Sequence, residues 1–279
     1  LAAGWCVYRR APARERLLIA GVLPAAWTSI AFAAGGLETF TGLSARWTLA
    51  AVVAGTVVLA ATWRRREDEA PVAWPRPGWE TLPAVLALAG GVAVLIYGRV
   101  VEPWGGWDAL FTWVLRAKFL FVGGELWANA FSPDLALLHP DYPPLLGWGL
   151  AGLWRLEGMP TPAAVGCLIL PATVGYVLAV IGWWRIAPGD GPWRPVAVAA
   201  LLTVPIVWRL AAGSLADFLL AYGVLISAAW LTMAIRSAPA GAMIVAGALL
   251  GWCGLIKNEG LLWMLVATAT TLGSVLLRR

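Results

Sequence analysis

Long apolar runs separated by short polar stretches dominate this chain. A membrane-spanning helix needs about 20 mostly apolar residues. The segment Tyr142–Trp154 would reach only about 20 Å as a helix, short of a hydrocarbon core of about 30 Å, so we predict a half-helix or re-entrant piece there. Eight other segments are predicted to span: Leu17–Leu37, Trp47–Trp63, Thr81–Gly98, Pro162–Trp184, Pro195–Ala212, Phe218–Ile235, Ala240–Ile256 and Gly260–Leu277. The pattern therefore predicts an all-α fold, a polytopic transmembrane helical bundle.

The distribution of Lys and Arg predicts the orientation of these spans. Arginines cluster before the first span and after the second, and such clusters favour the cytoplasm. The third span then delivers Val100–Asp141 to the outer face. If Tyr142–Trp154 does not cross, the inside-to-outside count of Lys and Arg is 13 to 7, and if it crosses the count is 11 to 9. The first arrangement fits better, and it also gathers polar residues at the outer face: Asp108, His139, Asp141, Asp217, Lys257 and Glu259.

The amino-acid composition agrees with a membrane protein and gives no indication of nucleic-acid binding or of a metal site. Hydrophobic residues make up 61% and charged residues 13%, against about 25% charged in soluble domains. The net charge of +5 comes mostly from Arg residues at the ends of the apolar segments. Such residues indicate how the spans are oriented in the membrane, and not nucleic-acid binding. The three cysteines are far apart and the chain has a single histidine, so no metal site is predicted.

We find no internal repeat and predict one membrane domain over residues 1–279. Residues 1–79 form an N-terminal two-span region with a cytoplasmic linker, and residues 80–279 form a core that contains the external loop 100–143. The chain starts at Leu1 and not at Met, which leaves open whether it is complete or a fragment.

The external loop carries the first candidate residues. Asp108, Thr112 and Arg116 follow one another at spacings of four, which would place them on one face of a helix lying along the membrane interface. Asp108 either stabilises the N-terminus of this helix through its negative charge or acts as a general base. Arg116 and Lys118 either extend their charges toward water or bind phosphate.

A proline-rich segment later in the same loop holds the lone histidine. In His139-Pro-Asp141-Tyr142-Pro-Pro the prolines restrict the backbone and delay the next helix until after Pro144. We therefore expect a stiff turn that presents His139, Asp141 and Tyr142 just above the apolar half-helix.

Two further polar positions lie between predicted spans. Asp217 stands at the start of a span, where it either caps the helix or belongs to a site. Lys257 and Glu259 lie between two apolar helices, where they form either a solvated turn or a contact to an anionic headgroup.

Taken in order, these pieces resemble the GT-C superfamily of integral-membrane glycosyltransferases, in particular glycosyltransferase family 39-like bacterial members similar to protein mannosyltransferases and lipid-A aminoarabinose transferases. Asp108 matches an acidic residue early in an interface-lying helix of the first large external loop. That family often has two adjacent acidic residues there, and here Asp108 stands alone. The other matching elements are a His-Pro-Pro-Leu-type segment with an Asp-Tyr insertion at His139–Leu145, an Asp before a later span at Ala216–Ala221, and Lys257.

The resemblance implies transfer of a sugar from a polyprenyl-phosphate donor to a hydroxyl of a glycan, lipid or protein acceptor. The reaction would take place at the outer face of a bacterial-type cytoplasmic membrane, with inversion. Asp108 would be catalytic, and Arg116, Lys118, His139, Asp141, Tyr142, Asp217, Lys257 and Glu259 would bind substrate or phosphate. Participation of a divalent metal stays open. The alternatives are a transporter or flippase for a lipid-linked or anionic substrate, and a non-catalytic assembly protein.

Overall fold

The structure is a computed structural model that describes residues 16–42, 44, 81–186, 193–214, 216–237 and 240–276. Throughout these residues the regular elements are helices, and no strand occurs among them, which confirms the all-α prediction. The predicted span Trp47–Trp63 lies outside the described residues.

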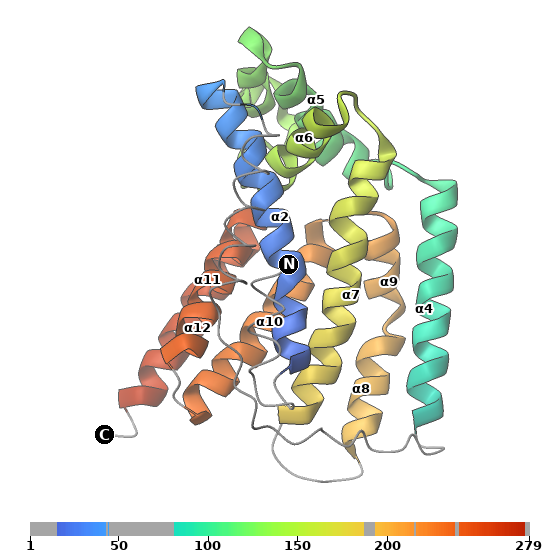
Figure 1. The fold of residues 1–279 in the computed structure, drawn as a ribbon, viewed down its shortest axis with the longest axis vertical. Coiled ribbons are helices and arrows are strands. Elements are labelled where there is room, and N and C mark those ends of the chain that lie inside the picture. The colour runs from blue at the N-terminus through green and yellow to red at the C-terminus, as the bar shows by residue number, and fades with distance from the viewer. Residues whose placement is uncertain are drawn as a thin grey trace, which may run out of the picture.

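Four of the described helices are long and apolar enough to cross a membrane. Each fulfils the length requirement that the hydropathy pattern predicted, and they run along the long axis of the molecule (Figure 1). They are α2 (Arg16–Thr41), α4 (Leu82–Val101), α7 (Pro162–Ile186) and α10 (Ala216–Ser237). Two further apolar helices, α11 (Ala240–Ile256) and α12 (Asn258–Leu276), pack as a hairpin against α10.

The predicted span Pro195–Ala212 is wrong as a single helix. The chain forms α8 (Trp193–Thr203) and α9 (Pro205–Ala212), with Val204 in an extended conformation between them. Proline lacks the N–H that a continuous helix needs and disfavours helical dihedrals in the residue before it. The two pieces both pack against α4.

The connection between α4 and α7, residues 102–161, gathers at one end of the bundle (Figure 1). We call it the connecting region. It contains the π-helix η2 (Ala109–Val114), α5 (Leu115–Val122), the 3₁₀ helices η3 (Gly124–Phe131) and η4 (Pro133–Leu138), and α6 (Leu145–Glu157). Helix α6 has 13 residues, and it lies at this end beside α5 (Figure 1).

Glycines allow α2 and α6 to approach closely. A Cβ atom added at Gly35 would lie 2.1 Å from the carbonyl oxygen of Trp148, and one added at Gly152 would lie 2.5 Å from that of Ala31. Small residues at such crossings bring backbones together and increase dispersion contacts. The connecting region is thereby fixed to the bundle through α6.

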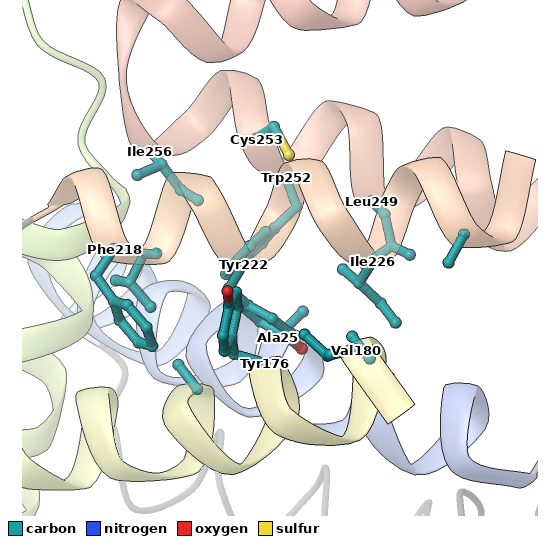
Figure 2. Packing of buried hydrophobic residues seen from close by; sticks show 14 of the residues in the cluster. Ala25, Tyr176, Val180, Phe218, Tyr222, Ile226, Leu249, Trp252, Cys253 and Ile256 are labelled. Atoms are coloured by element: carbon teal, nitrogen blue, oxygen red, sulfur yellow. The ribbon is translucent and has the colours of Figure 1, made fainter. Parts of the chain in front are cut away.

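The bundle core is centred on an aromatic pair between α10 and α11. Figure 2 shows Tyr222 beside Trp252, and their ring centroids lie 5.6 Å apart in an edge-to-face arrangement. The Tyr222 hydroxyl donates to the carbonyl oxygen of Gly21, and the Trp252 indole N–H donates to Thr28 Oγ1 at 3.0 Å. Both polar groups are thus satisfied within an apolar core, and both tie α2 to the C-terminal helices.

We predict that Gly35→Ala destabilises the protein by about 1–3 kcal/mol, because the new methyl overpacks the α2–α6 contact. Gly36→Ala is the matched control, since its added Cβ would have no neighbour closer than 3.9 Å. The control should be neutral or gain up to about 1 kcal/mol from helix propensity. Thermal unfolding of the detergent-solubilised variants measures both effects. Equal midpoints for the two variants would contradict the close α2–α6 approach.

Candidate functional site

A buried arginine fixes the proline-rich turn of the connecting region. Arg116 is 0% exposed. One of its terminal nitrogens donates to the carbonyl oxygen of Tyr142 at 2.9 Å, and the other donates to that of His139. Burial lowers the pKa of Arg116 to about 10, while the charge of Asp141 acts in the opposite direction. The guanidinium therefore stays charged at neutral pH and holds the backbone of the turn.

The turn that Arg116 holds is tight and presents aromatic rings. His139 adopts a positive φ of 47°, which is uncommon for a residue other than glycine, and the Tyr142 N–H donates to the His139 carbonyl at 2.9 Å. The Tyr142 ring stacks with the His139 ring at 4.7 Å between centroids and with the Trp113 ring at 5.5 Å. Tyr142 is thus held by its backbone and its ring.

Lys257 lies between α11 and α12 and meets charges from two helices. Its Nζ is 2.8 Å from Oδ1 of Asp217 at the start of α10, and 3.5 Å from Oε1 of Glu259 at the start of α12. The lysine side chain is 13% exposed, whereas those of Asp217 and Glu259 are 40% and 57% exposed. Solvent therefore reaches the carboxylates more readily than the ammonium.

The surroundings of Lys257 keep it protonated. Burial by itself lowers its pKa, but the hydrogen bond and charge of Asp217 act in the opposite direction, as do Glu259 and Tyr142. The net result is a raised pKa, so Lys257 is a cation throughout the neutral range.

A second contact joins the turn to α12. The Asn258 side-chain amide donates to Oδ2 of Asp141 at 3.1 Å. Asn258 was not among the predicted site residues. The signal that could have found it is its place between Lys257 and Glu259, where a polar residue opens a helix.

Seven residues therefore form one group, which we call the loop-end cluster. It combines three carboxylates with one ammonium, one amide and two stacked rings. Four different elements or turns contribute to it, and the contacts above connect them. Its members are His139, Asp141, Tyr142, Asp217, Lys257, Asn258 and Glu259.

Asp108 and Lys118 lie outside the contacts of this cluster. Both are exposed, and Asp108 Oδ1 accepts a hydrogen bond from Thr112 Oγ1 at 3.2 Å. This hydrogen bond places Asp108 and Thr112 on one face, as predicted, but Thr112 and Arg116 are buried whereas Asp108 is exposed. The residues between Asp108 and Leu115 form the π-helix η2, whose hydrogen bonds span one extra residue per turn.

The start of η2 is nevertheless fixed next to α10. The Gly106 N–H donates to the carbonyl oxygen of Gly213 at 3.0 Å, four residues before Asp217. From there η2 leads to Trp113, which stacks on Tyr142 of the loop-end cluster. Asp108 and the cluster are thus connected through one short element, η2.

An apolar pocket lies against η2 and shares Trp113 with the ring stack on Tyr142. Its walls come from η2, α6 and α7 and from the residues that flank η2 and α10. Trp113 lines it, and the indole N–H of this buried residue has no hydrogen-bond partner within the described part of the chain. The lining residues are Trp104, Ala109, Trp113, Val114, Leu146, Leu150, Val165, Leu168, Ile169 and Ser214.

Comparison with known proteins adds no relative. No family model, curated protein or solved structure matches the chain. Over the described residues, no group of three or more His, Cys, Asp and Glu side chains is arranged to hold a metal ion.

We predict that Arg116→Leu destabilises the connecting region by about 3 kcal/mol, because two carbonyl oxygens lose charge-assisted hydrogen bonds. Lys118→Leu is the matched control on the same helix, at an exposed position, and should change stability by less than about 0.5 kcal/mol. Unfolding midpoints and limited proteolysis of residues 132–144 measure the effect. A cleavage rate in Arg116→Leu equal to that of the control would show that the arginine does not hold the turn.

Proposed function

We propose that the protein transfers a sugar from a polyprenyl-phosphate donor to an acceptor hydroxyl at the outer face of a bacterial-type cytoplasmic membrane. The observation that supports this most is the loop-end cluster at one end of an apolar helical bundle. Its carboxylates accept hydrogen bonds from sugar hydroxyls, and aromatic rings provide apolar faces with specific stacking geometry. A membrane-embedded substrate reaches such a site along the apolar helices.

Lys257 is the proposed contact for the donor phosphate. The C–O bond between the anomeric carbon and the lipid phosphate breaks in the reaction, and its electron pair stays on the phosphate. A cation already in place stabilises that developing charge. Lys257 suits this role because Asp217 and Glu259 hold its position and because its pKa is raised.

Asp108 is the proposed general base. The acceptor oxygen attacks the anomeric carbon, the new C–O bond forms, and the hydroxyl proton moves to the Asp108 carboxylate. An exposed carboxylate next to a water-filled or substrate-filled space can accept that proton. The hydrogen bond from Thr112 orients it, and η2 relates it to the loop-end cluster. Attack opposite the leaving phosphate gives inversion.

Arg116 and Lys118 take different roles in this proposal. Arg116 is a structural cation, since it is fully buried and donates to two backbone carbonyls. Lys118 is exposed and would attract anionic lipid headgroups near the site.

A transporter for a lipid-linked substrate is the second candidate, because the break between α8 and α9 is a feature of transporter helices. The two classes differ in product. A transferase forms a new glycoside and releases polyprenyl phosphate, whereas a transporter moves the intact lipid-linked substrate between leaflets.

Purified protein in liposomes with radiolabelled polyprenyl-phosphate sugars should form labelled glycoside. Asp108→Asn should lower the turnover by about 100-fold or more, because the amide cannot accept the proton. Glu102→Gln is the control, since Glu102 is also an exposed carboxylate beside the same loop, and it should retain activity. Movement of intact donor without glycoside formation would overturn the transferase in favour of the transporter.

The proposed orientation places both ends of the site outside the cell. In a chain whose native cysteines are replaced, Lys118→Cys and Asn258→Cys should react with a membrane-impermeant maleimide on intact cells. Leu276→Cys, at the far end of α12 and 68% exposed, should react only after permeabilisation. Reaction of positions 118 and 258 from opposite sides of the membrane would exclude the proposed active site.

A further inference from the structure

The Lys257 ammonium lies over an aromatic ring as well as beside carboxylates. Its Nζ is 5.5 Å from the centroid of the Tyr142 ring, which is within the range of about 6 Å where a cation is attracted to the ring face. The lysine is 13% exposed, and this attraction strengthens as water is removed. The contact therefore joins the proline-rich turn to the α11–α12 connection.

We propose that Tyr142 is a positioning residue whose ring, and not its hydroxyl, holds the Lys257 ammonium at the loop-end cluster. The inference concerns how the site is built, and only its effect on catalysis rests on the proposed function.

The ring has a fixed place from which to act. Arg116 binds the Tyr142 carbonyl, and Trp113 and His139 stack with the ring. A ring held in this way provides a fixed point of attraction for the Lys257 ammonium. The position of Lys257 therefore depends on the buried Arg116, which holds the turn that carries the Tyr142 ring.

The Tyr142 ring also adds to the electrostatic attraction that acts on the Lys257 ammonium. Asp217 and Glu259 both attract the ammonium, and each has a more exposed side chain than the lysine. Carboxylates alone would draw Nζ toward solvent. The Tyr142 ring adds a further attraction, with its centroid 5.5 Å from Nζ, without adding negative charge that would repel a phosphate.

Two variants distinguish the effect of the electron density on the Tyr142 ring face from the effects of its shape and its hydroxyl. Tyr142→Phe keeps the ring and removes the hydroxyl. Tyr142→3,4,5-trifluorophenylalanine, introduced by nonsense suppression, keeps a similar shape and withdraws electron density from the ring face. The chain has two lysines, Lys118 and Lys257, so acylation by an amine-reactive ester can be measured at both sites by mass spectrometry. Exposed Lys118 serves as the internal standard.

The rate of Lys257 acylation relative to Lys118 should be unchanged in Tyr142→Phe. It should rise by about three- to tenfold in the trifluorinated variant, because a cation–π contact of this kind is lost. The turnover of sugar transfer should fall further in the trifluorinated variant than in Tyr142→Phe.

The results of the acylation and transfer assays distinguish the role of the ring, the role of the hydroxyl and the proposed transferase function. Unchanged acylation in the trifluorinated variant would overturn the inference, and increased acylation in Tyr142→Phe would assign the role to the hydroxyl. If acylation changes as expected while the wild-type protein forms no glycoside, the positioning role stands and the proposed transferase function fails.

Discussion

The connecting region depends on one buried charge. Arg116 is fully buried, and a buried cation is costly unless hydrogen bonds compensate for its lost hydration. The carbonyl groups of His139 and Tyr142 provide that compensation, and in return their backbone is confined to one conformation. Removing either the arginine or the turn would leave the other without its partners. The stack on Trp113 and the contact of Tyr142 with Lys257 both follow from this fixed backbone.

The helices were predictable where hydrophobic length alone decides the structure. The runs that became α2, α4, α7 and α10 are each long enough to cross an apolar layer, and no tertiary contact is needed to recognise them. Hydropathy failed at Pro205, because the average over a window hides a single missing N–H. The same limit applies to η2, because spacing along the chain does not reveal its π-helical hydrogen bonding.

The sequence predicted that several of the cluster's polar residues would lie at one face, and it did not predict their contacts. The parity of the spans placed Asp141, Asp217 and Lys257 at one face, and the structure joins Asp217 to Lys257 and Asp141 to Asn258. The Asp141–Asn258 pair is separated by 117 residues, a distance at which no sequence periodicity reports contact. Arg116 was expected either to extend its charge toward water or to bind phosphate, and only the three-dimensional arrangement shows its hydrogen bonds to the backbone.

The charge balance of the loop-end cluster restricts what it can bind. The cluster contains three carboxylates and a single ammonium, so a free anion would meet more repulsion than attraction, while a neutral molecule rich in hydroxyl groups finds several acceptors. An anionic group is tolerated only where it approaches the lysine directly. The donor that we propose, a sugar whose one charge is a phosphate at its anomeric carbon, would meet both conditions if its hydroxyls faced the carboxylates and its phosphate faced Lys257. This is why the proposed donor fits the cluster better than an inorganic anion, and why the position of the lysine matters more than its charge alone.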